Sequence, residues 1–264
     1  IELSMDYDGA VAAAEEAASY IKNKQFADSV YFYMDYDFAG QLAKEQRNLD
    51  EAINYYLLAV KDLEAKYPEL TEDKKKEENV NKRGSYYYEL SNLYVRNKQA
   101  EQGIEIFQKY LELLGDKADI SDRYMLGTKY LAAYQQQDIT PEKKAEFFTK
   151  ADEAFKAVIE SGAENRLPIV LAYQQRARLN NTDTQKPLDI VRDYYQKVIE
   201  ESNAPEVEAK AKNARFEACR YLFFYYVAID TPNKEEATKY AEIAKGINPE
   251  DNFVKAAFEH IATM

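Results

Sequence analysis

Residues 87–110 read YYELSNLYVRNKQAEQGIEIFQKY. The second half of this stretch carries small or apolar residues at Gly103, Phe107 and Tyr110, a spacing of i, i+4, i+7 that gives an α-helix one apolar face. The first half sets the small Ser91 four residues after the large Tyr87. A small residue where two helices cross lets their backbones approach, and a facing aromatic ring fills the space beside it. The stretch therefore predicts a pair of packed, antiparallel helices.

The same apolar stripe recurs along the chain. Successive stripes start 42, 51, 48, 40 and 46 residues apart, at Ala10, Ala52, Gly103, Ala151, Val191 and Ala237. Each full stripe follows a segment rich in tyrosine and small residues, and charged or polar extensions such as 68–83 lengthen the repeats. One helix pair cannot bury both of its apolar faces, so neighbouring pairs are expected to stack. The sequence therefore predicts a series of stacked helix pairs.

These residues resemble the tetratricopeptide repeat (TPR), whose pattern is Trp-x2-Leu-Gly-x2-Tyr, then Ala-x3-Phe-x2-Ala, then Pro. Two copies keep the family's spacing of about 34 residues without gaps. They place Tyr36, Gly40, Ala52, Tyr56 and Ala59, and then Tyr221, Phe224, Ala237, Ala244 and Pro249, at the template positions. The chain has no tryptophan, so tyrosine or another residue takes that position in every copy.

The resemblance covers nearly the whole chain and implies an all-α fold, a right-handed α-α superhelix of about twelve helices. We predict one TPR-like solenoid over residues 1–264. Its parts are a half repeat at 1–25, helix pairs at 26–70, 73–115, 120–162, 166–203 and 205–249, and a capping helix at 250–264. Pro141, Pro205 and Pro249 are predicted at helix starts, where a missing N–H is tolerated.

Composition excludes several classes of partner. The 264 residues are 46% hydrophobic and carry a net charge of −12, so the chain lacks the basic surface with which proteins bind nucleic acid. No run approaches the roughly 18 apolar residues of a membrane span. The single cysteine, Cys219, stands among apolar residues and is expected to be a buried, unreactive thiol.

The residue types that carry catalysis are scarce. There is one histidine, His260, beside Glu259, and no glycine-rich loop that would cradle a phosphate. A zinc site needs several His and Cys ligands, and the two candidates lie 41 positions apart. The 47 acidic residues offer many carboxylate pairs, none of which stands out. We therefore expect no enzyme activity, no cofactor and no metal.

Tyrosine is unusually frequent, with 23 copies. The bulk of these are expected to pack in the core in place of tryptophan. However, neighbouring residues on a helix point about 100° apart, so Tyr86, Tyr87 and Tyr88 cannot all enter one core. Some tyrosines must therefore face solvent or a ligand.

The resemblance implies that a peptide or protein segment binds in the concave groove formed by the first helices of the pairs. Carried over position by position, the groove consists of Asp37, Gln41, Lys44, Tyr88, Asn92, Arg96, Tyr124, Thr128, Gln174, Arg178, Leu222 and Tyr226. The carboxylate-clamp subgroup has Lys and Asn where this chain has Asp37 and Gln41, so that function is not expected. A segment with basic residues near Asp37 and acidic ones near Arg178 is the favoured ligand.

Two alternatives stay open from the sequence. One is a glycan- or nutrient-binding component of an exported lipoprotein system, and the other is a structural module that oligomerises through the open solenoid ends. The stretch 172–249 resembles exported TPR proteins of Bacteroidetes, which implies a periplasmic or otherwise exported location. The identity of the partner does not follow from the residues.

Overall fold

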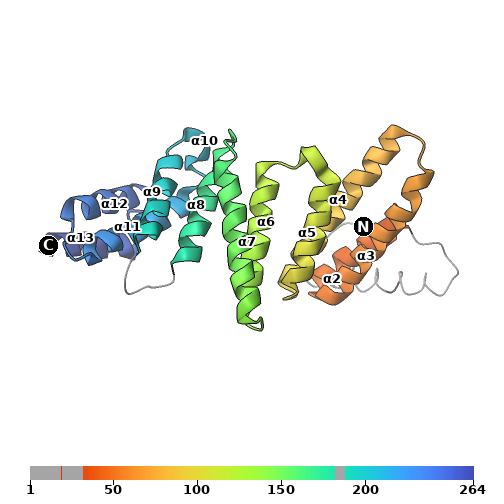
Figure 1. Ribbon diagram of the computed structural model, residues 1–264, viewed down its shortest axis with the longest axis horizontal. Helices are drawn as coiled ribbons and strands as arrows, with labels where there is room; N and C mark the ends of the chain where they lie inside the picture. Colours follow the sequence, from red (N-terminus) through yellow and green to blue (C-terminus); the bar gives the residue numbers. More distant parts are fainter. Residues whose placement is uncertain (1–18, 20–31, 182–187) are drawn as a thin grey trace. The chain divides into compact units, whose positions relative to one another are not determined.

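The structure is a computed structural model that describes residues 19, 32–181 and 188–264. The described residues contain twelve α-helices and two short 3-10 helices, and no strand occurs among them (Figure 1). The all-α fold and the number of helices are confirmed. The predicted half repeat at 1–25 lies outside the described residues, Ser19 excepted.

The helices group into two compact units, Ile1–Ala118 with Ala132–Ile139, and Asp119–Leu131 with Thr140–Met264. Unit 1 contains α2 (Tyr33–Glu45), α3 (Leu49–Lys66), α4 (Asp73–Arg96) and α5 (Ala100–Leu114), with 3-10 turns at Tyr67–Glu69 and Gly115–Lys117. Unit 2 contains most of α6 (Ile120–Tyr134), then α7 (Pro141–Glu160), α8 (Arg166–Asn180), α9 (Asp189–Glu201), α10 (Pro205–Glu208), α11 (Lys212–Ala228), α12 (Lys234–Ile247) and α13 (Asn252–Thr263). The division into one solenoid with the stated repeats stays a prediction.

Side-chain caps explain where several helices begin. The Thr140 hydroxyl accepts a hydrogen bond from the Lys143 N–H, and Pro141 follows as the first residue of α7. The Asp251 carboxylate accepts from the Phe253 N–H at 2.8 Å, so α13 begins at Asn252, three residues after Pro249. A capping carboxylate satisfies an N–H that has no partner within the helix, and here it sets the start more closely than the proline does.

Small residues and aromatic rings pair at the helix crossings, as the repeat pattern predicts. A Cβ added to Gly40 of α2 would lie 3.1 Å from the ring of Tyr56 on α3. In the next pair, the buried Ser91 donates its hydroxyl hydrogen bond to the Gly103 carbonyl at 2.8 Å, and Phe107 is fully buried. The backbones of α2 and α3 therefore approach each other with an aromatic ring packed at the crossing. The backbones of α4 and α5 approach each other with a hydrogen bond at the crossing.

The three consecutive tyrosines divide between core and surface. Tyr86 and Tyr87 are buried, whereas Tyr88 is half-buried and packs its ring 6.1 Å from Phe107 and 5.6 Å from Tyr110. The helical geometry therefore leaves the third tyrosine at the surface.

The charged extension at 68–83 is largely helical, because it forms a 3-10 turn and the first turns of α4. The buried Asn79 of α4 donates its side-chain N–H to the Leu63 carbonyl at 2.8 Å, in the last turn of α3. This bond ties the added turns of α4 to the end of α3. The extension is thus part of the packed structure of unit 1.

Cys219 is fully buried in unit 2, and burial raises the pKa of its thiol to about 12. The position of Cys219 therefore agrees with the expected unreactive thiol, because little thiolate forms near neutral pH.

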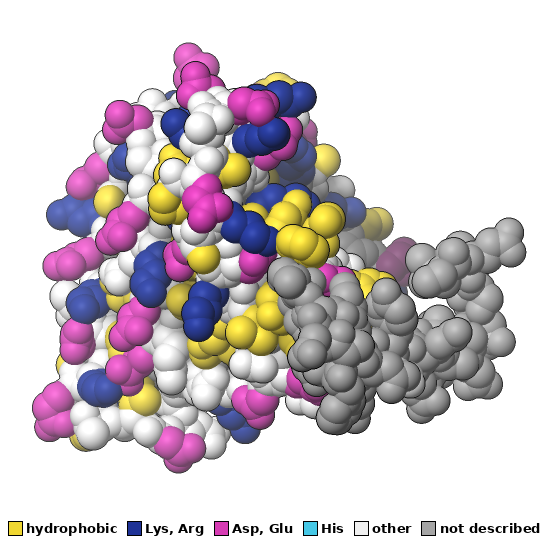
Figure 2. Space-filling model, turned by 90° about the vertical axis from the view of Figure 1, so that its right-hand side faces the viewer, with side chains coloured by type: hydrophobic (Ala, Val, Ile, Leu, Met, Phe, Trp, Pro, Cys, Tyr) yellow, Lys and Arg dark blue, Asp and Glu magenta, His cyan; other side chains and the backbone are white. Residues whose placement is uncertain are grey.

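On the face drawn in Figure 2, acidic and basic side chains are interspersed, without an uninterrupted basic area. None of the described helices is both long and apolar enough to cross a membrane.

Candidate partner-binding surface

Side chains join the first helices of neighbouring pairs within each unit. In unit 1, the Lys44 Nζ of α2 lies 2.9 Å from the Glu89 Oε1 of α4. In unit 2, the Gln175 side chain of α8 donates to the Tyr124 hydroxyl of α6 at 3.3 Å. These contacts show that consecutive first helices lie next to each other in each unit, as a binding surface built on them requires.

Glu217 of α11 is the centre of a polar cluster that reaches two other helices. Its carboxylate accepts from the Arg178 Nε at 2.7 Å and also from the Arg178 Nη2, so the pair is bidentate. Gln174 and Tyr195 each donate to it at 2.8 Å. Paired donors of this kind fix both partners in orientation. The cluster therefore connects α8, α9 and α11.

The cluster keeps Glu217 ionised. Burial alone would raise the pKa of this carboxyl, but the hydrogen bonds from Arg178, Tyr195 and Gln174 outweigh it and lower the pKa. Sequence reasoning missed Glu217, although one signal was present. It is the only acidic residue between 209 and 229, in an otherwise apolar, basic and aromatic segment.

Replacing Glu217 by glutamine is expected to lower the free energy of unfolding by about 1–3 kcal/mol at pH 7, because the amide offers one acceptor where the carboxylate has two. A carboxyl with a lowered folded pKa stabilises above its unfolded pKa, about 4.3, and loses that contribution as pH falls through the folded pKa. The difference between the two proteins should therefore shrink in acid. Urea unfolding between pH 7 and pH 3 measures it.

Glu200→Gln is the matched control, since the Glu200 side chain is 59% exposed and, among the described residues, forms an ion pair with Lys197 of its own helix alone. An exposed pair of this kind contributes less than about 1 kcal/mol. Equal losses for the two variants, or a Glu217 effect that does not change with pH, would contradict the proposed role of the cluster.

The other predicted groove residues of unit 2 have local partners. The Tyr124 ring packs 5.7 Å from Phe155, and the Thr128 hydroxyl donates to the Met125 carbonyl of its own helix at 2.7 Å. Gln174 is only 5% exposed, so it supports the cluster and contributes little surface. Arg178 keeps 49% of its side chain exposed, but its charge is balanced by Glu217.

In unit 1 the predicted residues spread over two helices. Asp37 accepts from Gln41 at 2.9 Å within α2, and Lys44 bridges to α4. On α4, Asn92 is half-buried and Arg96 is exposed. These side chains therefore lie on two helices of unit 1, α2 and α4.

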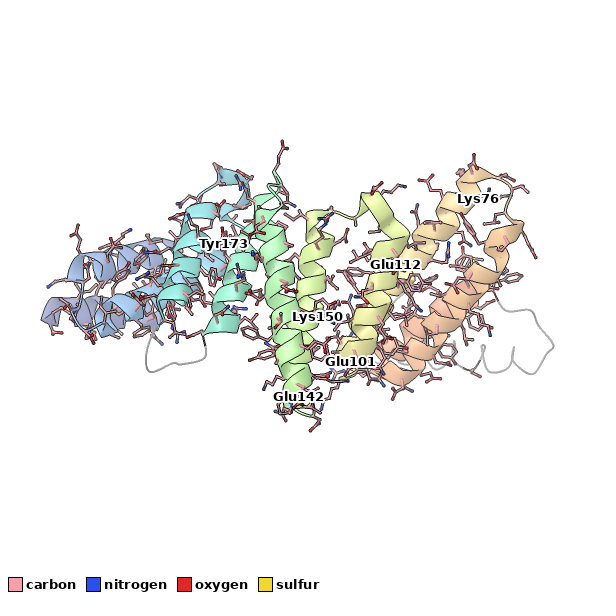
Figure 3. The ribbon with its side chains drawn as sticks, in the orientation of Figure 1. Lys76, Glu101, Glu112, Glu142, Lys150 and Tyr173 are labelled. Carbon is pink, nitrogen blue, oxygen red and sulfur yellow. The ribbon has the colours of Figure 1, made fainter. Side chains whose placement is uncertain are left out.

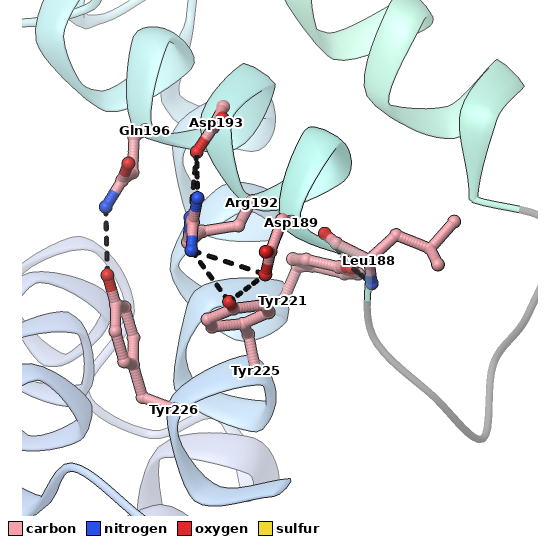
Figure 4. A network of polar contacts seen from close by, with 8 residues as sticks. All are labelled: Leu188, Asp189, Arg192, Asp193, Gln196, Tyr221, Tyr225 and Tyr226. Carbon is pink, nitrogen blue, oxygen red and sulfur yellow. Dashed lines mark hydrogen bonds and ion pairs between the residues drawn. The ribbon is translucent and has the colours of Figure 1, made fainter. Parts of the chain in front are cut away.

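The prediction of Leu222 as a groove residue is wrong, because Leu222 is fully buried. Tyr226 is half-buried with its ring stacked 5.9 Å from Tyr240 of α12, and its hydroxyl accepts from Gln196 of α9 (Figure 4). Nearby, the Tyr225 hydroxyl accepts from Arg192 at 2.7 Å and donates to Asp189. The tyrosines at the end of α11 thus join it to α9 and α12.

The error comes from the alignment of α11 with the repeat pattern, which is displaced by two residues. In α4 the buried pair Leu90–Ser91 ends 12 residues before Gly103, whereas in α11 the buried pair Leu222–Phe223 ends 14 residues before Ala237. The connection after α11 is therefore two residues longer, and the gap-free alignment of this copy does not hold. In the corrected register, Arg220 and Phe224 replace Leu222 and Tyr226, and both are exposed.

No family model matches the chain, and no curated protein matches it. Among solved structures, it is similar to the C-terminal part of a TPR repeat-containing protein from Cytophaga hutchinsonii, with a TM-score of 0.60 and 20% identity over 95% of this chain and 86% of that one. The fold is TPR-like.

A second similar structure is BtubC (BKLC) from P. vanneervenii, with a TM-score of 0.54 and 14% identity over 93% of this chain and 92% of that one. At such identities the TPR-like fold is shared, and the side chains of the surface have to be judged from this chain alone.

Among the described residues, no three His, Cys, Asp or Glu side chains are grouped so that they would hold a metal ion.

Proposed function

We propose that this chain is a protein-interaction scaffold that binds a partner polypeptide on the exposed face of α11 and α8 in unit 2. The observation that carries the proposal is a row of Glu217, Arg220 and Phe224 on one face of α11, at the spacing i, i+3, i+7. Phe224 is 50% exposed, more than Phe32, which precedes α2, or Phe38 of α2. Aromatic residues and arginine are enriched in protein–protein interfaces relative to the rest of the surface.

The ring of Phe224 is held in place from below. It lies 5.5 Å from the ring of Phe223 and 5.8 Å from that of Phe253 on α13, both of which are more buried. A ring fixed in this way offers an apolar contact with little loss of side-chain entropy on binding. Phe224 therefore suits an apolar anchor residue of the partner.

Besides its apolar anchor residue, the partner is expected to carry a charged side chain that matches the charge of this surface. Because Glu217 neutralises Arg178, the exposed Arg220 is the better candidate to meet an acidic side chain of the partner. The partner segment that fits best has an apolar residue followed or preceded within one helical turn by Asp or Glu. The acidic residues that the sequence places near Arg178 of α8 are therefore proposed to lie near Arg220 of α11.

Phe224→Ala is expected to weaken binding of the partner at least about tenfold, since an anchor residue contributes 2 kcal/mol or so. Crosslinking in the native organism identifies the partner, and calorimetry with the purified partner measures the dissociation constant. Arg220→Glu should weaken binding as well and reduce its dependence on salt.

Phe32→Ala is the matched control, because Phe32 is 46% exposed but belongs to unit 1. Its affinity should equal that of the wild type. Equal affinities for Phe224→Ala and the wild type would refute the surface, and a wild-type oligomer that Phe224→Ala dissolves in light scattering would make it a self-association site instead.

A further inference from the structure

The segment around α11 has a charge opposite to that of the whole chain. Residues 209–229 contain four basic side chains and one acidic one, in a protein whose net charge is −12. The acidic side chain is paired with α8, and one of the basic ones is paired with α10. Lys212 and Arg220 are exposed, and neither forms an ion pair within 4.0 Å with a described residue. The surface of α11 therefore presents two positive charges that no carboxylate of the described chain balances.

Charges on other helices are balanced locally. Figure 3 labels Glu142 and Lys150 of α7, a helix that carries both signs of charge. The Lys150 Nζ lies 2.6 Å from the Glu146 Oε1 one turn away, and such pairs along a helix leave little net charge for a partner. The charged side chains of α11 form their ion pairs with α8 and α10 instead. Lys212 and Arg220 are left over on its surface.

These two cations alternate with phenylalanine rings on one face of α11. Lys212, Phe216, Arg220 and Phe224 follow one another at the spacing i, i+4, which makes consecutive side chains neighbours on the helix surface. The rings of Phe216 and Phe224 both contact Phe253 of α13, at 6.0 Å and 5.8 Å between ring centres. Phe216 is half-buried and Phe224 is exposed. We call these four residues the basic–aromatic row; it is about 18 Å long.

The polar groups beside the row bear on the shape of the partner segment. An extended segment needs donors and acceptors for its peptide groups, and a helical surface has no strand edge to supply them. On α8, which packs against α11, Gln174 and Arg178 already donate to Glu217, and Gln174 is buried. A helix satisfies its own peptide groups and presents side chains at the same i, i+4 spacing. The basic–aromatic row therefore favours a helical segment.

We propose that the basic–aromatic row binds an amphipathic helix of the partner in which acidic and apolar residues alternate at every fourth position. Apolar side chains contact the Phe216 and Phe224 rings, and carboxylates pair with Lys212 and Arg220. Contact along the whole row requires a small crossing angle, in the class near about 20°. This inference rests on the proposed function of α11 and adds the shape of the bound segment, a second apolar contact and a second ion pair.

The probe for the test is an alanine- and glutamine-based helical peptide of about 17 residues, with glutamate and leucine alternating at every fourth position. Calorimetry with the full chain should show saturable binding that weakens as salt is added. One control peptide has lysine in place of glutamate, and another has a central proline that breaks the helix. Each control should bind at least about tenfold more weakly, because the first repels the row and the second cannot present its side chains together.

Variants of the chain locate the peptide on the row. Lys212→Glu and Arg220→Glu should each weaken binding about fivefold or more, because an attraction becomes a repulsion. Phe216→Ala should weaken it at least about tenfold, and circular dichroism checks that each variant is folded. Lys61→Glu is the matched control, since Lys61 of α3 is exposed and has no ion-pair partner among the described residues. Its affinity should equal that of the wild type.

The outcomes separate this inference from the proposed function. No saturable binding of the glutamate peptide, equal binding of either control peptide, or unchanged affinity in folded Lys212→Glu and Phe216→Ala would overturn the acidic helix as the ligand. If Phe224→Ala still weakens binding of the native partner in that case, the α11 surface stands and only the shape and charge of its ligand are wrong. If Phe224→Ala has no effect on the native partner or on the peptide, both proposals fail.

Discussion

Replacing Phe155 by alanine is expected to lower the free energy of unfolding by about 3–5 kcal/mol, the usual cost of removing a large ring from a core. Phe155 of α7 is fully buried and packs on the Tyr124 ring at 5.7 Å, opposite Gly127 of α6. With glycine on the facing helix, no side chain is available to fill the cavity. Urea unfolding followed by circular dichroism measures the loss.

Phe224→Ala serves as the control for this substitution. It removes the same atoms from a ring that is 50% exposed, so the expected loss is smaller by a factor of about two or more. If both variants lose the same stability, the Phe155 ring does not hold α6 and α7 together in the way described.

Replacing Gly127 by alanine is the second large effect, an expected loss of about 1–3 kcal/mol through overpacking. A Cβ at Gly127 would lie 2.7 Å and 2.8 Å from two atoms of the Phe155 ring. A ring that is fully buried has no space into which it can move. In an ordinary helix, by contrast, glycine to alanine stabilises by about 0.5–1 kcal/mol.

Gly246 of α12 gives the matched comparison, because a Cβ there meets nothing within 4 Å. Gly246→Ala should therefore leave stability unchanged or raise it. The double variant Gly127→Ala with Phe155→Leu tests the contact itself. If the methyl group and the ring compete for one space, the double variant should be more stable than the sum of the single losses predicts. Additive losses would contradict the direct clash.

The pairing of small and large residues is the part of the fold that local sequence predicts best. Gly40 with Tyr56 is set by helical periodicity and by the short connection between α2 and α3. Gly127 and Phe155 follow the same rule across a longer connection. Each helix has to bury its own stripe, so these pairs are fixed before any contact between repeats is known.

The surface was harder to predict, since it depends on register and on partners from other helices. Leu222 and Phe224 differ by two positions along α11, and a two-residue change in the following connection exchanges which of them is buried. The positions of the charged residues in the sequence also do not show which arginine is left without a carboxylate partner. Arg178 and Arg220 belong to the same arginine-rich segment, but only the packing of α8 on α11 brings Glu217 to Arg178.

The sequence by itself therefore determined that this protein is a series of helix pairs with small residues at the crossings, because those features repeat within each helix and need no distant partner. Only the tertiary structure decided which side chains remain available. It buried Leu222, balanced Arg178 with Glu217 and exposed Phe224. The physical reason is that burial and charge balance are properties of neighbouring helices, and the pairing of helices is set by connections whose lengths vary from one repeat to the next.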